Sequence, residues 1–168
     1  MSLSYTIKKE KIGSSISISL QFNADDLPTD CLSLEQAGRG IMNDLGCSFM
    51  KEGLSKFDIE DPQIKVDNMT YYKKEKTSQT YETTFGKIRL ERSTYQNSGG
   101  GKTVCPLEES ARTVLCSTPA YAKMVSHMAA LMPMGQVVNV IKKEFGVPIS
   151  KEYVSNISDK IGELVKKK

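Results

Sequence analysis

Near the end of the chain, six residues restrict how the segments on either side of them can fold: Phe145-Gly146-Val147-Pro148-Ile149-Ser150. Gly146 can take the left-handed conformation that closes a helix, and Pro148 prevents a helix from continuing. Ser150 can cap the first turn of the next helix. The junction therefore predicts a short, fixed connection between two helices.

The residues flanking this junction have the spacing of two amphipathic helices, over 134–145 and over about 150–165. A preceding helix begins after the signal Ser117-Thr118-Pro119 and is stopped by Pro133. We predict a compact three-helix unit containing a helix-turn-helix, the arrangement that places a recognition helix in the major groove of DNA. Its last two helices are expected to pack through facing apolar stripes: Val137, Val138 and Ile141 on one, and Val154, Ile157, Ile161 and Leu164 on the other.

The opposite face of the last helix is polar. Lys151 can meet a phosphate or a guanine, and Asn156 can pair with adenine through two hydrogen bonds. The hydroxyl groups of Ser150 and Ser155 can donate to phosphate oxygens. The alternative is a solvated face on a helical hairpin of any function. The predicted DNA-binding residues are Ser150, Lys151, Ser155, Asn156, Lys142 and Lys143, with Asp159 on the same face as Lys151, Ser155 and Asn156.

Charge is distributed unevenly along the 168 residues. The whole chain has a net charge of +3, whereas the segment from Pro119 onward carries eight lysines against four acids, a net charge of +4. Each lysine that contacts a phosphate adds salt-dependent affinity. The net positive charge therefore lies in the region that we expect to bind DNA.

The first part of the chain mixes strand and helix patterns. Alternation of apolar and polar residues over 16–22 predicts a half-buried strand after Gly13. Ser33 and Gln36 form a capping-box pattern, which predicts the start of a long amphipathic helix. The apolar spacing of that helix fades by Asp58.

A β-hairpin is predicted over 81–96, where two alternating segments flank a glycine-containing turn. Pro106, followed by two acids, predicts a short helix that extends to Leu115. We therefore expect an α+β protein with two parts. These are an N-terminal region, 1–104, and a helical DNA-binding domain, 105–168.

The sequence also disfavours several classes of protein. No apolar run reaches the ~18 residues that cross a membrane, and the charged residues 8–11 interrupt any leader. We expect a cytoplasmic, nucleoid-associated protein with no membrane partner. Its cysteines should stay reduced in that compartment. They are Cys31, Cys47, Cys105 and Cys116.

Two patterns suggest small-ligand sites, and we set both aside. The first is the even spacing of Cys105, Cys116 and His127. A structural zinc site has four ligands, usually in close pairs, and this pattern has neither. We therefore favour incidental cysteines, and structural packing for the histidine. The sequence Gly101-Lys102-Thr103 resembles a phosphate-binding loop, but Gln96 replaces its first glycine. We expect no cofactor, metal or catalytic residue. A methionine stripe is most simply core: Met124, Met128 and Met132.

The second half of the chain carries four motifs in a fixed order: Tyr81–Gln96, Gly99–Glu109, Thr118–His127 and Gly146–Val154. Together they resemble the amino-terminal region of ISKra-type bacterial insertion-sequence transposases. The similarity extends from about residue 81 to residue 165, half of the chain. The first eighty residues share with that family only a long helix ahead of the hairpin.

This resemblance implies a DDE transposase whose amino-terminal region binds the terminal inverted repeats of its element. In that family a ribonuclease-H-like domain follows, in which three carboxylates hold two divalent metals. The chain ends at Lys168, so we expect the catalytic domain to be absent and the protein not to be an enzyme.

We therefore expect sequence-specific binding to double-stranded DNA by a truncated transposase, either in recognition of element ends or in regulation of transposition. In one hypothesis the helix around 41–49 pairs two chains as a homodimer, and in the other it packs within one chain. The alternative function is a protein-interaction module that modulates a full-length transposase without contacting DNA. An exposed basic cluster on the last helices favours DNA, whereas an exposed apolar patch there favours a protein partner.

Overall fold

The computed structural model describes residues 3–166. Within this range it contains two small antiparallel sheets and five α-helices, so the expected α+β class is confirmed. The chain divides into two compact units, Met1–Phe49 and Met50–Lys168. The boundary that we expected between residues 104 and 105 therefore lies inside the second unit.

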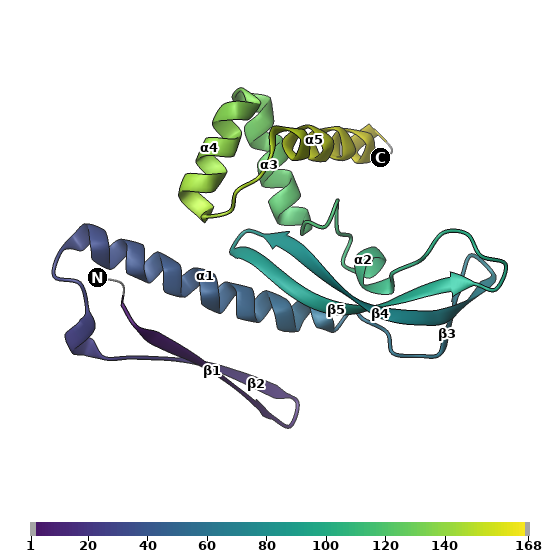
Figure 1. Ribbon diagram of the computed structural model, residues 1–168, viewed down its shortest axis with the longest axis horizontal. Coiled ribbons are helices and arrows are strands. Elements are labelled where there is room, and N and C mark those ends of the chain that lie inside the picture. Colours follow the sequence, from purple (N-terminus) through teal and green to yellow (C-terminus); the bar gives the residue numbers. More distant parts are fainter. Residues whose placement is uncertain (1–2, 167–168) are drawn as a thin grey trace. The chain divides into compact units, whose positions relative to one another are not determined.

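The first unit begins with a two-stranded antiparallel hairpin of β1 (Tyr5–Ile12) and β2 (Ser15–Phe22), drawn in purple in Figure 1. β2 confirms the strand predicted after Gly13, whose φ of 59° suits glycine at the tight turn. The sequence pattern does not predict β1, because the charged residues 8–11 obscure its alternation. A short 3-10 helix, η1 (Ala24–Asp26), follows β2.

The long helix α1 (Cys31–Ser55) begins in the first unit. The predicted start at Ser33 is wrong by two residues, because Asp30 rather than Ser33 caps the helix. Asp30 Oδ1 accepts a hydrogen bond from the backbone N–H of Ser33 at 2.9 Å. This bond lowers the pKa of the Asp30 carboxyl group below its ordinary value. The helix ends before Asp58, where its apolar pattern fades.

The second unit contains a three-stranded antiparallel sheet in the order β3 (Gln63–Val66), β4 (Met69–Thr83) and β5 (Gly86–Asn97). The hairpin predicted over 81–96 is confirmed, but its first strand begins far earlier because the β4–β5 ladder continues to the pair Tyr71–Asn97. β3 is absent from the sequence prediction because four residues are too few to show a period.

Helix α2 (Pro106–Ser110) begins at the predicted proline but ends before Leu115, so its predicted length is wrong. Leu115 and Cys116 both have positive φ angles, and the chain turns sharply there instead of continuing as helix. The backbone N–H of Glu82 donates to the carbonyl of Cys116 at 2.8 Å, and the N–H of Thr118 donates to the carbonyl of Glu82 at 2.9 Å. These bonds fasten the last three helices to the end of β4.

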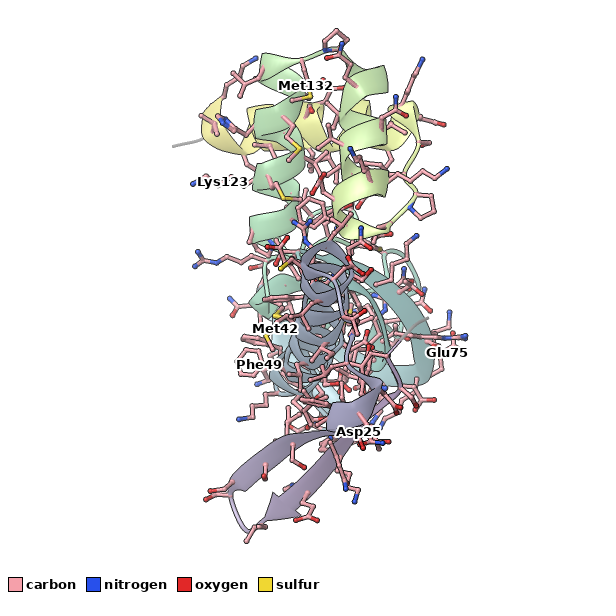
Figure 2. All side chains as sticks on the ribbon, turned by 90° about the vertical axis from the view of Figure 1, so that its left-hand side faces the viewer. Asp25, Met42, Phe49, Glu75, Lys123 and Met132 are labelled. Atoms are coloured by element: carbon pink, nitrogen blue, oxygen red, sulfur yellow. The ribbon has the colours of Figure 1, made fainter. Side chains whose placement is uncertain are left out.

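Those helices are α3 (Pro119–Leu131), α4 (Met134–Phe145) and α5 (Lys151–Lys166), close to their predicted ranges. α3 and α4 lie side by side and α5 packs against both, as Figure 2 shows at its top. The methionine stripe on α3 packs against their common core, as predicted. The core consists of Val114, Tyr121, Ala122, Val125, Val137, Ile141, Val154 and Ile157.

Two expectations about these helices are wrong. His127 is exposed on α3, so it is not a packing residue. Leu164 is 46% exposed, because the apolar stripe of α5 passes beyond the end of the core after Ile161. The buried part of the stripe is therefore shorter than the sequence pattern predicts.

Candidate nucleic-acid interface

The junction between α4 and α5 has the local structure that its residues predict. Gly146 has a φ of 67°, and its N–H donates to the carbonyl of Lys142 at 3.1 Å to close α4. Ser150 Oγ accepts the N–H of Tyr153 at 3.0 Å and so caps α5. Between them Val147 is buried. The capping bond uses one acceptor site of Ser150 and leaves its hydroxyl hydrogen able to reach a phosphate.

The direction of the junction differs from expectation. Residues 146–150 run back alongside α4, so the start of α5 lies near the start of α4 rather than near its end (Figure 1). A Cβ atom placed on Gly135, in the first turn of α4, would lie 3.4 Å from Lys151 Cε. A helix-turn-helix joins its helices by a turn of three or four residues at the end of the first helix. The structure therefore does not confirm the predicted helix-turn-helix.

This arrangement separates the candidate residues into two groups. Lys142 and Lys143 are exposed in the last turn of α4, about 11 Å along the helix axis from Gly135. Lys151 and Asn156 are exposed on α5, whereas Ser155 is half-buried. The predicted set is thus one basic pair at the end of α4 and one polar group at the start of α5.

Acidic residues flank Asn156 on α5, a feature that the predicted DNA-binding face did not include. Glu152 and Asp159 are exposed and lie on the same helical stripe as Asn156, together with Glu163. Glu163 forms an ion pair with Lys160 at 2.9 Å. The i, i+4, i+7, i+11 spacing of this stripe was readable in the sequence. Its negative charge disfavours phosphate contact along this stripe of α5.

A cavity of about 720 Å³ lies elsewhere in the second unit, between α2, the turn at Leu115 and the end of α5. Two of its lining side chains, Leu115 and Leu164, are each 46% exposed. Burial raises the pKa of the Cys116 thiol, which also lines this cavity, so that thiol is a poor nucleophile. Sequence reasoning missed this cavity, because its walls come from segments far apart in the chain. The charged residues of its wall are Glu108, Glu109 and Arg112.

The ligand patterns that we set aside have no supporting geometry in the described part of the chain. Cys105 is buried, Cys116 is half-buried and His127 is exposed, and no three His, Cys, Asp or Glu side chains in residues 3–166 are grouped to hold a metal. After the glycine-rich loop, Val104 exchanges two backbone hydrogen bonds with Tyr95 instead of opening a helix.

Among residues 3–166, no helix has both the length and the apolar character needed to cross a membrane. Compared with known proteins, the sequence matches no family model and no curated protein.

Proposed function

We propose that the chain binds double-stranded DNA through the end of α4 and the start of α5. The observation that carries this proposal is that exposed lysines at the end of α4 and at the start of α5 form no ion pair. Within residues 3–166, Lys142, Lys143 and Lys151 form no ion pair, as is also true of Lys65 and Lys74, whereas four lysines of the second unit have a carboxylate within 3.4 Å: Lys73, Lys76, Lys87 and Lys160. Unpaired lysines can neutralise phosphates and release counterions without first breaking an internal bond.

Base reading is assigned to the first two turns of α5. Asn156 can pair with adenine, and the neighbouring carboxylate of Glu152 can accept a hydrogen bond from the amino group of cytosine. The acidic stripe repels phosphates beyond this point, so the helix can enter a groove only by its amino-terminal end. The resemblance of residues 81–165 to ISKra-type transposases supports the terminal inverted repeats of a mobile element as the target.

A binding experiment on labelled duplexes over a salt series tests this function. The double variant Lys142→Ala/Lys143→Ala should reduce the slope of log affinity against log salt by about two, because about one counterion is released per phosphate contact. The matched control is Lys65→Ala/Lys74→Ala, which removes the same charge from exposed positions on β3 and β4. An equal reduction of this slope in the control variant would contradict a defined interface.

Recognition of the DNA base sequence is tested with a separate variant. Asn156→Ala should lower the preference for element-end duplexes over scrambled duplexes by ~1–3 kcal/mol while leaving the salt slope unchanged. A uniform loss on both duplexes would show that Asn156 does not read bases. Absence of any binding at low salt would reject the DNA function itself.

A second candidate function rests on the cavity beside α5. Leu115 and Leu164 form an exposed apolar surface on its wall. Val165, which follows Leu164 in the sequence, is 68% exposed. An apolar surface on the last helices favours a protein partner. The corresponding proposal is a module that modulates a full-length transposase. Leu164→Asp should abolish capture of a purified transposase without changing DNA affinity, and the opposite pattern would reject this candidate.

A further inference from the structure

The first unit buries very little apolar surface. Among residues 3–49, Leu3 and Ile41 are the only apolar side chains that are buried. The sheet of this unit has two strands, β1 and β2, and both of its outer edges lack a ladder partner within the described residues. A two-stranded hairpin is marginal in water, and small folds need oligomerisation or covalent links to become stable. Further burial of apolar side chains would therefore stabilise this unit.

One face of α1 exposes three large apolar side chains. Leu34, Met42 and Phe49 are 45%, 58% and 65% exposed. Gly38 and Leu45 complete a stripe at three- and four-residue spacing, which we call the α1 stripe. The stripe contains no charged residue. A Cβ atom on Gly38 would meet nothing within 4 Å, so another helix can approach there closely.

The hairpin of the first unit does not cover the α1 stripe. Its Tyr5 hydroxyl donates a hydrogen bond to the carboxylate of Asp44. Asp44 lies two residues after Met42, about 200° around the helix, and so points away from the stripe. The hairpin and the stripe therefore belong to different faces of α1.

We propose that the α1 stripe is the contact between two copies of this chain, packed antiparallel about a two-fold axis at Met42. Leu34 lies about 12 Å before Met42 along the helix axis, and Phe49 lies about 10.5 Å after it. An antiparallel pair therefore sets Leu34 of each copy against Phe49 of the other. The stripe is complementary to itself, as a two-fold contact requires.

The size of the stripe sets the expected strength of this contact. From Leu34 to Phe49 the helix is about 22 Å long, which buries less than the ~800 Å² per partner of a standard interface. The dimer should therefore be weak and reversible. The proposal does not rest on DNA binding, since it uses none of the residues of α4 or α5.

Analytical ultracentrifugation of the full chain without DNA tests the contact. We expect a mass that rises from 18.6 kDa towards twice that value as the concentration increases to several hundred micromolar. Phe49→Lys should weaken association about 100-fold, because both copies of the substitution fall in one interface. Leu32→Lys is the matched control, because Leu32 is also 65% exposed on α1 but lies about 100° away from Phe49.

A mass of 18.6 kDa at every concentration would overturn the proposal, and so would equal weakening by the control variant. Circular dichroism of each variant confirms that the comparison is made between folded chains. The antiparallel arrangement has its own test in the double variant Leu34→Glu/Phe49→Lys. Opposite charges then face each other across the axis, and the double variant should associate more tightly than either single variant. If it associates no better, this arrangement is wrong.

Discussion

The two units of this chain differ in how they bury apolar side chains. In the second unit, Tyr121, Val125 and Ile157 are fully enclosed by the three helices. In the first unit, Met42 and Phe49 are side chains of similar size that stay mostly exposed on one helix. Burial contributes roughly 25 cal/mol per Å² of apolar surface. The second unit is therefore stabilised by its own core, whereas the first unit would gain stability from the contact that we propose between two copies of the chain.

The largest expected effect comes from the core of the second unit. Ile157→Ala should lower its free energy of unfolding by ~2–5 kcal/mol, because it leaves a cavity among side chains that cannot collapse completely. Urea denaturation followed by circular dichroism measures the change. The control is Leu32→Ala in α1, which should cost under ~0.5 kcal/mol. Similar losses for the two variants would show that the difference between the units is not real.

A smaller effect distinguishes two buried tyrosines of the second unit. The Tyr95 hydroxyl lies 2.8 Å from the carbonyl oxygens of both Ile59 and Asp61, and these two acceptors share its single donor hydrogen. Tyr95→Phe should cost ~1–3 kcal/mol, because those carbonyls lose their donor. Tyr121→Phe should be neutral or stabilising, because the Tyr121 hydroxyl is buried without a hydrogen-bond partner in the described residues. The reverse order of stabilities would contradict the hydrogen-bond assignment.

The smallest effect is a pH dependence. Burial raises the pKa of Tyr81 and Tyr121 above the ordinary value of 10.0. The folded state therefore holds the phenol proton more tightly than the unfolded state does. The contribution of each tyrosine to the free energy of unfolding is complete below pH 10 and is lost as the pH rises further. At pH 10.5 the loss should be below about 1 kcal/mol per tyrosine. Urea midpoints between pH 8 and pH 10.5 measure it, and Tyr121→Phe should flatten the curve.

The elements that were predicted well from the sequence are helices whose ends are marked by capping or helix-breaking residues. Pro133, Gly146 and Ser150 end or begin helices through their own backbone and side-chain chemistry, so α3, α4 and α5 were placed closely. α2 was predicted too long: it ends at Ser110, Arg112 takes a positive φ of 52°, and the chain at Cys116 and Thr118 pairs instead with Glu82, which is distant in sequence. β1 lacked a visible period for a different reason, since charged residues occupy its exposed positions.

The candidate site was predictable only in part. The exposure of Lys142, Lys143 and Lys151 follows from helical periodicity, and the acidic stripe around Asn156 follows from the same rule. The separation of these residues into two groups does not. It depends on the path of residues 146–150 back along α4, which is set by packing of the helices rather than by any single residue.

The contrast between the units is tested most directly by amide hydrogen exchange at several protein concentrations. We predict that protection along α1 rises with concentration, because dimers cover the α1 stripe, and that protection in β1 and β2 rises with it because dimer formation stabilises the whole first unit. Protection in α3, α4 and α5 should stay constant. High protection of the first unit at every concentration would contradict the proposed dimer, since it would show a unit that is stable without a second chain.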